Sequence, residues 1–479
     1  MKPFIRKKLP YILIAVQAVL ILGLLFYIVP GRYRLYDIVL YDASEYVPAN
    51  PMIGYAPAAE NPEDCAQTSL VFIQLPFSEW EPERGVFDTE GLSRKYHVDD
   101  YRAAGKHAVL RFVCDVPGTE AHADIPQWLV ESSGSGVAYE DSTGRGFAPD
   151  YADETFLDAH REALRALADW CRQDSFVSYV EVGSLGQNGV LRDAADSAPA
   201  VSDETVREYA RQYEQAFPAE SGIRLLFSPG VLSDAPGGSW NDVLGDADAS
   251  GVWQRETVSA EAVNAEQTGP DAEAGNRQAE AGKNVPLWTI RPVGGGLSSG
   301  VPMEELLMDR LSDTLEQVRS SHVSFIGPLA PDSEQQSSNG SEMIRRDIGY
   351  CIYLSRMQTT VDFIEDDLLL HFTFANIGQA PLYWDWPVTM YIYDNKGTCI
   401  REQTLDLQIS GLLPDGELTA VGSVPYDKSL LKGYSVGLSV RSPDGRDKVT
   451  FAQKGVLPDA QGVHIIYRYR GGGHRHHHH

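Results

Sequence analysis

The sequence predicts a (β/α)8 barrel of the TIM type followed by an antiparallel β-sandwich, and two observations carry this prediction. Between about residues 60 and 357, short apolar runs bounded by turn formers alternate with amphipathic segments of helical spacing. From about Thr359, apolar and polar residues alternate with a period of two, and no helical segment interrupts them. A doubly wound open sheet is the alternative arrangement for the first region.

The chain begins with an apolar segment that is expected to cross a membrane. Residues 11–29 carry no charge, and at about 1.5 Å per residue a helix of this length just spans a bilayer. Lys2, Arg6, Lys7 and Lys8 precede the segment, whereas only Arg32 and Arg34 follow closely. The positive-inside rule therefore predicts a cytoplasmic tail at 1–9, an anchor at 10–30 and an extracytoplasmic remainder. A cleaved signal peptide is the alternative, but no small-residue cleavage site follows the segment.

The elements of the barrel can be assigned in order. Residues 31–59, with three prolines, are expected to form a stem. The expected strands are Ser69–Trp80, His107–Asp115, Phe176–Gly189, Ile223–Leu232, Val285–Val293 and His322–Leu329. The expected helices include Thr155–Arg172, Asp203–Phe217, residues 302–321 and Ser341–Ser355. Residues 256–284 are acidic and almost free of large apolar side chains, so they are expected to form a mobile insertion on a barrel loop.

Residues 358–470 are expected to form the sandwich. Turns of the Asn-Lys-Gly and Pro-Asp-Gly type separate their alternating runs. Residues 471–479 form a Gly and His tail, which is set apart from the functional argument.

Composition and motifs exclude several classes of function. The 479 residues hold 40 Lys plus Arg against 67 Asp plus Glu, a net charge of −27 that disfavours a duplex nucleic-acid binder. The five cysteines show no metal-ligand spacing and allow at most two intrachain disulfides. No P-loop, nucleophile elbow, H-E-x-x-H or dinucleotide motif is present, so neither a cofactor nor phosphoryl or hydride transfer is expected.

Two resemblances give the barrel an expected function. Ser78–Asp88, which follow the first expected strand, resemble the Trp, Glu-Pro and Gly-x-Phe-Asp pattern of retaining glycoside hydrolases with TIM barrels. Over nearly all of the chain beyond about Asn50, the sequence resembles the bacterial family known only as domain of unknown function 4832. The segments that carry this second resemblance include Ile125–Leu129, Pro149–Tyr151, Val180–Gly189 and Ala375–Pro381. It implies a secreted barrel related to glycoside hydrolases, followed by a β-sandwich.

The sequence departs from the family at the expected active site. Members commonly carry a Trp-Gly-Glu-Trp-His signature, but Val190 stands where the Glu, a candidate general acid, is expected. A later strand that often presents Gly-Glu reads Arg291 to Gly296 and holds no carboxylate. A glycosidase needs two carboxyl groups facing the scissile bond. These absences favour a degenerate site that binds a polysaccharide or oligosaccharide without turnover.

An active glycosidase is the alternative, with Glu181 as the acid and Glu79 or Asp115 as the second carboxylate. For Glu181, an interior ion pair with Arg111 or Arg291 is the favoured interpretation, and a loop cap is favoured for Asp115. A scaffold protein of the cell envelope, with a protein partner, is a further alternative.

The expected substrate-binding residues lie on or near the loops that follow the strands. Aromatic rings suit a saccharide groove because sugar rings stack on them. The expected set is Arg111, Trp128, Tyr139, Gln187, Asn188, Arg192, Trp288 and Arg291. Trp80 and Trp240 are expected at the same face. The aromatic loop Tyr383–Trp386 is either a second carbohydrate platform or a wedge that docks the sandwich on the barrel, and the wedge is favoured.

Overall fold

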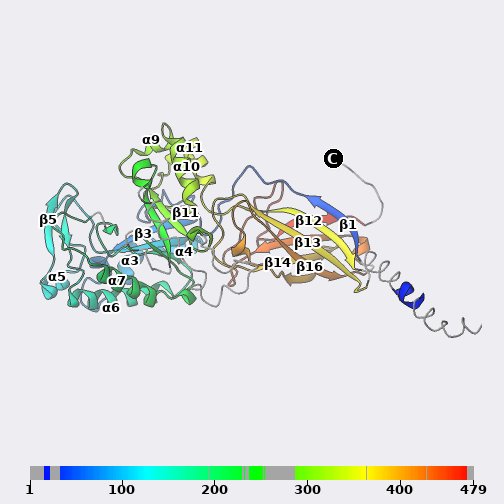
Figure 1. The fold of residues 1–479 in the computed structure, drawn as a ribbon, viewed down its shortest axis with the longest axis horizontal. Coiled ribbons are helices and arrows are strands. Elements are labelled where there is room, and N and C mark those ends of the chain that lie inside the picture. The colour runs from blue at the N-terminus through cyan, green and yellow to red at the C-terminus, as the bar shows by residue number, and fades with distance from the viewer. Residues whose placement is uncertain are drawn as a thin grey trace, which may run out of the picture.

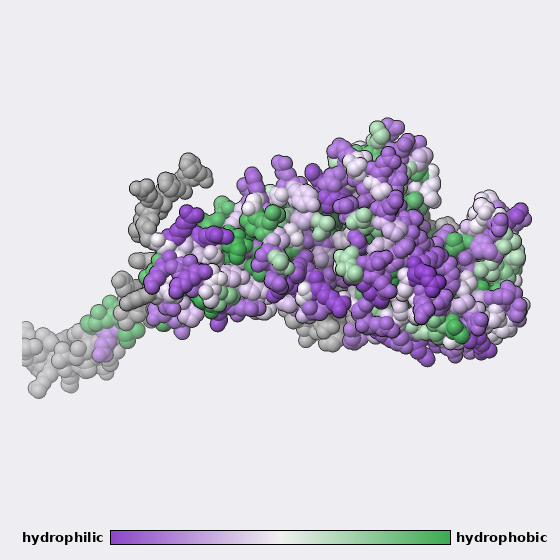
Figure 2. Space-filling model, turned by 180° about the vertical axis from the view of Figure 1, so that it is seen from behind, coloured by the Kyte–Doolittle hydropathy of each residue, from purple (hydrophilic) through white to green (hydrophobic). Residues whose placement is uncertain are grey.

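The computed structural model describes residues 16–21, 33–191, 194–228, 231, 237–251, 253, 286–362, 364–427 and 429–471 (Figure 1). Most of the expected anchor at 10–30, nearly all of the insertion at 256–284 and the tail from residue 472 lie outside these ranges. Within these ranges, no helix has the length and hydropathy of a membrane span. The surface seen in Figure 2 is mainly hydrophilic, as the excess of carboxylates leads one to expect.

The first body is a nearly closed barrel of eight parallel strands. The strands are β2 (Gly54–Tyr55), β3 (Leu70–Pro76), β4 (His107–Val113), β7 (Val177–Glu181), β8 (Arg224–Phe227), β9 (Gly238–Leu244), β10 (Val293–Leu297) and β11 (Val323–Ile326). From β3 to β11 each strand of the barrel pairs with the next along the chain, and β11 pairs back onto β2. A bridge between Ala58 and Phe72 joins the segment after β2 to β3. The predicted TIM-type barrel is therefore confirmed, and the open sheet is wrong.

Helices cover the outside of the barrel. They are α2 (Phe77–Trp80), α3 (Thr89–Lys95), α4 (Val98–Ala103), α5 (Gln127–Ser133), α6 (Glu154–Cys171), α7 (Asp203–Ala216), α9 (Met303–Leu307), α10 (Leu311–Ser321) and α11 (Asn339–Arg346). The bounds of α6 and α7 agree with the prediction to within one residue. The Asp153 side chain accepts a hydrogen bond from the backbone N–H of Phe156 and so caps α6. Its buried face, which includes Leu164 and Leu167, packs into the core between the helices and the sheet.

Near β10, one expected strand is wrong and one strand was missed. The segment expected as a strand at Val285–Val293 holds the short 3-10 helix η6 (Leu287–Thr289), and β10 begins only at Val293. The strand β9 was not predicted at all. A Cβ at Gly295 of β10 would collide with the carbonyl oxygen of Asn241 on β9, so the glycine permits this close approach.

Two expected helices end or break early. The helix expected at Ser341–Ser355 ends at Arg346, and Gly349 then adopts a φ of 76° before strand β12 begins at Ile352. The helix expected at 302–321 is divided into α9 and α10 at Met308. The remaining 3-10 helices are η2 (Ala219–Ser221), η7 (Gln335–Ser337), η8 (Ile409–Gly411) and η9 (Leu430–Lys432).

The second body is a sandwich of two antiparallel four-stranded sheets. One sheet has the order β1 (Tyr33–Leu40), β12 (Ile352–Asp362), β13 (Asp367–Asn376) and β16 (Glu417–Pro425). The other has the order β15 (Cys399–Thr404), β14 (Val388–Asp394), β17 (Tyr434–Val440) and β18 (His464–Tyr469). The expected stem at 31–59 is thus no separate spacer, because it supplies β1 to the sandwich and β2 to the barrel.

The sandwich packs on the amino-terminal end of the barrel. The Tyr383 hydroxyl donates to the carbonyl oxygen of Trp288 at 2.5 Å. The Trp384 ring lies 5.3 Å from the Tyr179 ring and 5.4 Å from the Arg224 guanidinium, which opens β8. The predicted wedge role of the Tyr383–Trp386 loop is therefore confirmed.

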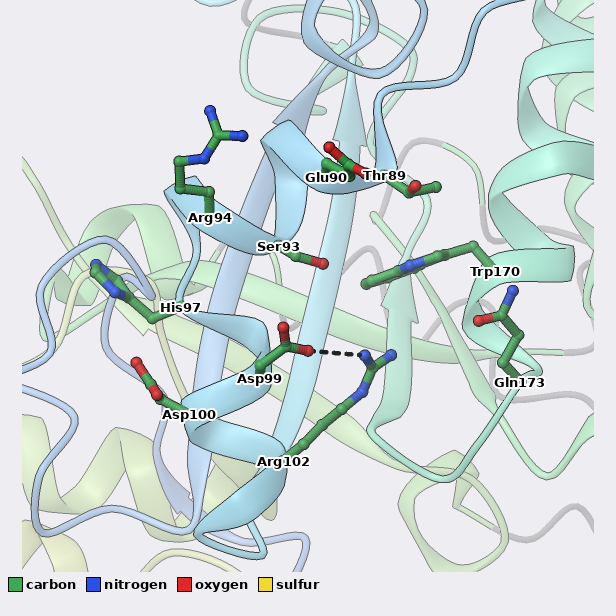
Figure 3. A pocket seen from close by; sticks show the side chains of 10 residues that line it. All are labelled: Thr89, Glu90, Ser93, Arg94, His97, Asp99, Asp100, Arg102, Trp170 and Gln173. Carbon is green, nitrogen blue, oxygen red and sulfur yellow. Dashed lines mark ion pairs between the residues drawn. The ribbon is translucent and has the colours of Figure 1, made fainter.

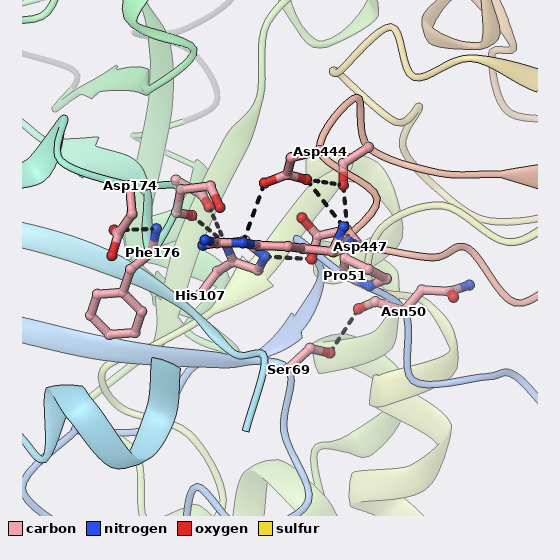
Figure 4. Close-up of polar contacts among 12 residues, drawn as sticks. Asn50, Pro51, Ser69, His107, Asp174, Phe176, Asp444 and Asp447 are labelled. Carbon is pink, nitrogen blue, oxygen red and sulfur yellow. Dashed lines mark hydrogen bonds and ion pairs between the residues drawn. The ribbon is translucent and has the colours of Figure 1, made fainter. Parts of the chain in front are cut away.

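A buried histidine joins the two bodies at the same interface (Figure 4). His107, the first residue of β4, has its Nε2 atom 2.7 Å from Asp447 Oδ1 of the sandwich. Its Nδ1 atom lies 2.6 Å from the carbonyl oxygen of Ser175. Both ring nitrogens face acceptors, so this contact fixes the sandwich against the amino end of β4.

Candidate functional site

An ion pair fills the barrel interior below the carboxyl ends of the strands. Arg111 of β4 and Glu181 of β7 are direct neighbours in the register of the two strands. The Arg111 Nε and Nη2 atoms lie 2.7 and 2.6 Å from Glu181 Oε2, and Glu181 has no exposed surface. The Arg111 guanidinium lies 4.2 Å from the centre of the Trp240 ring. The favoured interpretation of Glu181, an interior ion pair, is confirmed with Arg111 as its partner.

The electrostatics of Glu181 are set by burial. Burial raises the pKa of the Glu181 carboxyl to about 7, and Arg111 acts in the opposite direction. The charge of Asp242, at the carboxyl end of β9, raises this pKa further. The Oε1 atom is buried without a hydrogen-bond partner among the described residues. Glu181 is therefore a carboxyl group with a near-neutral pKa that is closed off from solvent.

A series of hydrogen bonds leads from Arg111 to the barrel mouth, which is the opening at the carboxyl ends of the parallel strands. The Arg111 Nη1 atom donates to Gln74 Oε1 at 3.3 Å and to the carbonyl oxygen of Asn188 at 3.2 Å. The Gln74 amide in turn donates to Asn188 Oδ1 at 3.2 Å. These bonds tie the end of β3 to the loop after β7.

A hairpin folds over the mouth and brings further polar groups together. Its strands are β5 (Val137–Asp141) and β6 (Gly144–Ala148). The Tyr139 hydroxyl donates to Asp115 Oδ1 at 2.6 Å, and the Gln187 amide donates to Thr143 Oγ1 at 2.9 Å. The backbone N–H of Asn188 donates to the carbonyl oxygen of Asp115 at 2.9 Å. Four of the predicted site residues, Asp115, Tyr139, Gln187 and Asn188, thus lie in one cluster.

Asp115 is the buried acid of this cluster. Burial raises the pKa of the Asp115 carboxyl to about 6, and the nearby charge of Asp124 adds to the rise. The Tyr139 hydrogen bond and the charge of His122 oppose the rise because both stabilise the carboxylate. Asp115 can therefore accept or donate a hydrogen bond in the mildly acidic range.

Several predicted site residues lie elsewhere. Glu79 forms an exposed ion pair with Lys95, with 2.7 Å between Nζ and Oε1. Trp128 is half-buried on α5 and donates to the carbonyl oxygen of Glu81 at 3.2 Å. Trp80 is buried beneath α6, where its indole donates to the carbonyl oxygen of Ala163.

The predicted placement of Trp288 and Arg291 at the mouth is wrong. Both precede β10 and so lie at the amino-terminal end of the barrel, and the Trp288 ring stacks on His322 at 3.7 Å. The error follows from the misassigned strand at Val285–Val293. Trp240 is also misplaced, because it lies in the barrel interior under Arg111. Arg192 lies outside the described residues.

The positions at which the resemblance leads one to expect carboxylates are apolar. Val190 is buried and packs in the same apolar cluster as Tyr179 and Trp240. Strand β10 reads Val-Gly-Gly-Gly-Leu and carries no ionisable side chain. Neither position supplies an acid to the mouth.

The sequence analysis missed Gln74, Asp124 and Asp242. Asp242 belongs to β9, so assigning that strand would have placed it at a strand end, where barrel sites are built. Asp124 Oδ2 accepts from the backbone N–H of Val116 at 2.7 Å and lies 3.3 Å from His122 Nε2. No sequence signal marks Gln74, whose role depends on the register of β3 with β4.

A hollow of about 740 Å³ lies away from this cluster, among α3, α4 and the end of α6 (Figure 3). The Trp170 ring points into it, and Arg102 lies on its wall. Arg102 is paired with Asp99 at 3.5 Å and with Asp174 at 2.9 Å. The hollow lies in the outer helical layer, beside the segment that leads into β7, and none of the residues in the cluster around Asp115 lines it.

Comparisons with known proteins add the following findings. No protein-family model matches the sequence, so the resemblance to domain of unknown function 4832 is unconfirmed. No curated protein sequence matches it either. Among solved structures, endo-glycoceramidase II from Rhodococcus sp. matches at 14% identity over 78% of this chain and 97% of that chain, with a TM-score of 0.38.

Two further structures match with similar scores. An exo-beta-1,4-mannosidase from Opitutaceae bacterium strain TAV5 is 11% identical over 60% of this chain and 54% of that chain, with a TM-score of 0.37. A broad-specificity endoglucanase from an uncultured bacterium is 11% identical over 62% of this chain and 85% of that chain, with a TM-score of 0.36. At such TM-scores these matches carry no argument about the site.

Proposed function

We propose that the chain binds a polysaccharide or oligosaccharide at the carboxyl end of its barrel and does not hydrolyse it. The observation that carries the second half of this proposal is the Arg111–Glu181 pair. Both side chains are buried, and Arg111 holds Glu181 Oε2 from two nitrogen atoms. A general acid must reach the glycosidic oxygen, and a carboxyl group with no exposed surface does not.

The cluster at the mouth supports saccharide binding. Asn188 is half-buried at the mouth, and behind it Tyr139, Gln187 and Asp115 hold hydroxyl, amide and carboxyl groups that are buried and hydrogen-bonded within the cluster. Such groups match the donors and acceptors of sugar hydroxyls. The resemblance of Ser78–Asp88 to glycoside hydrolases supports the same class of ligand.

The proposal includes an anchor in a membrane. The uncharged apolar segment at residues 11–29 and the cations before it support a single span with the amino terminus in the cytoplasm. The barrel and the sandwich then lie outside the cell membrane.

A glycosidase is the second candidate, and one observation favours it. The pKa of Glu181 is raised to about 7, the range of a general acid, and Asp242 lies near enough to contribute to the rise. Catalysis through this pair requires Arg111 to release Glu181.

A glycan-array screen of the full chain tests the proposal, with release of reducing sugar measured on every glycan that binds. The wild type is compared with Glu181→Gln and with Asp115→Asn. Binding without release supports the proposal. Release of reducing sugar by the wild type establishes the glycosidase instead, and its loss in a Glu181→Gln protein that circular dichroism shows to be folded assigns the acid to Glu181. The absence of binding to any glycan overturns saccharide binding and leaves a protein partner as the ligand to seek.

A further inference from the structure

The first strand of the sandwich, β1, begins at the end of the sandwich that lies farthest from the barrel. Strand β12 begins at Ile352 beside the barrel and runs outward to Asp362. Strand β1 is antiparallel to it, and Tyr33, its first residue, pairs with Asp362. Tyr33 therefore lies at the outer end of the sandwich, and Figure 1 shows the described short helix at residues 16–21 beyond this end.

The outer end of the sandwich is formed by residues 364–366, 395–398, 426–427, 429–433 and 468–470. These residues connect or end the strands whose register places them beside Asp362 and Tyr434. Two large aliphatic side chains are exposed here, Ile364 at 55% and Leu431 at 45%. Tyr426 and Tyr469 are half-buried at the same end.

The charges at this end are mixed, in contrast to the net charge of −27 for the whole chain. Among the described residues of this end, the exposed cations are Lys396, Lys432, Arg468 and Arg470, and the exposed acids are Glu365, Asp366 and Asp427. Aliphatic side chains, tyrosines and long cationic side chains are the residue types that proteins place at the boundary between lipid tails and head groups.

We infer that the outer end of the sandwich rests on a lipid surface and that the barrel mouth faces away from it. The inference rests on the proposed anchor, because residues 11–29 end a few residues before β1. The lipid that contacts the outer end of the sandwich belongs to the bilayer that holds the anchor. In Figure 2 the apolar residues 16–21 extend the chain beyond this end of the sandwich.

The geometry also narrows the class of saccharide. Strand β12 has 11 residues and is about 36 Å long at about 3.3 Å per residue. Beyond it, the barrel adds on the order of 20 Å, because its strands of up to 7 residues are tilted by about 36°. The mouth thus stands on the order of 50 Å above the bilayer. The ligand is then an extended polymer that reaches out from the membrane, rather than the short head group of a glycolipid in the same bilayer.

The chain carries a natural probe for this arrangement. Cys399 is the one exposed cysteine, and it opens β15 beside Tyr393, near the outer end of the sandwich. The full chain is reconstituted into phosphatidylcholine vesicles with a donor dye on Cys399 and an acceptor dye on the lipid head groups. The efficiency of energy transfer between the two dyes is then measured. The matched variant carries Cys399→Ser with Ser142→Cys, which moves the dye to the exposed turn of the β5–β6 hairpin.

The expected result is strong transfer from Cys399 and transfer close to background from residue 142. Stronger transfer from residue 142 than from Cys399, or equal transfer from both, overturns the inference while leaving the anchor intact. Failure of the chain to float with vesicles overturns the anchor and this inference together, whereas saccharide binding in the array stays a separate result.

A second pair of variants tests the contact itself. Ile364→Asp with Leu431→Asp places two charges at the outer end and is expected to reduce the transfer from Cys399 by tilting the molecule off the surface. Ile377→Asp is the matched control, because Ile377 is also exposed, at 43%, but follows β13 beside the barrel. Equal transfer from the wild type and the double variant contradicts a lipid contact at the outer end.

Discussion

At the scale of single residues, the molecule is organised around one buried pair of opposite charges. The sequence left Arg111 and Arg291 as alternative partners for Glu181, because it shows which strands neighbour one another but not which of their residues are opposed. The register of β4 with β7 selects Arg111. Gln74 and Asp242 could not be predicted for the same reason, since their roles depend on strand ends and pairings that no local pattern encodes.

Removing one member of the pair should destabilise the barrel strongly. Glu181→Gln leaves the Arg111 guanidinium buried against Trp240 without a counter-charge, and we expect the free energy of unfolding to fall by about 3–5 kcal/mol. The double variant Arg111→Met with Glu181→Leu should lose much less, because no buried charge is left. Denaturant unfolding measures both, and a Glu181→Gln variant as stable as the wild type contradicts the account.

Asp115 should make stability depend on pH in the mildly acidic range. Its folded pKa is raised from 3.8 to about 6, so between these values the folded state binds more protons than the unfolded state. Its contribution to stability is thus fully present below about pH 4 and is lost as the pH rises to about 6. After allowance for partial solvent screening, we expect the loss to be about 1–2 kcal/mol.

The measurement is the free energy of unfolding of the wild type and of Asp115→Asn between pH 4 and 7. The wild type should lose stability relative to the variant across this range. If the free energies of unfolding of the two proteins change in parallel with pH, the Asp115 carboxyl group is solvated rather than buried.

At the scale of elements, the helices were easier to predict than the strands around them. Helices α6 and α7 combine a clear apolar face with a capping side chain, Asp153 or Ser202, so both their type and bounds follow from local residues. Strands β9 and β10 have neither signal. Their glycines permit close packing between neighbouring strands, which is a tertiary requirement that no local pattern shows. Because β10 was assigned too early in the sequence, Trp288 and Arg291 were placed at the wrong end of the barrel.

The wedge formed by Tyr383–Trp386 should hold the two bodies together. Trp384→Ala removes the ring that contacts Tyr179 and Arg224, and we expect a loss of about 2–3 kcal/mol because the ring is only partly buried. Asp385→Ala, at the exposed neighbouring position, should cost little. Differential scanning calorimetry measures both variants, and equal melting temperatures for the two would show that the wedge does not couple barrel and sandwich.

At the scale of the whole molecule, the barrel packs on the sandwich with the amino ends of its strands, and the carboxyl ends of the strands point away from the sandwich. The order of barrel and sandwich along the chain was predictable, because the change from helical to two-residue periodicity is visible in the sequence. The closure of the sandwich by β1 was not, since a strand separated from its partner by some three hundred residues carries no local mark of that pairing. This pairing is what places the start of the chain and the barrel mouth at opposite ends (Figure 1).

The most direct test of the central claim is calorimetric titration of the full chain with an oligosaccharide from the array, followed by mass spectrometry of the recovered sugar. We expect intact sugar and saturable binding that Gln187→Ala weakens about tenfold, a loss of about 1.4 kcal/mol. Glu79→Gln, which alters the exposed pair with Lys95 and the hydrogen bond from the Tyr96 hydroxyl, should bind as the wild type does. Shortened sugar, or binding that Gln187→Ala leaves unchanged, would contradict a binding site at the barrel mouth that lacks hydrolysis.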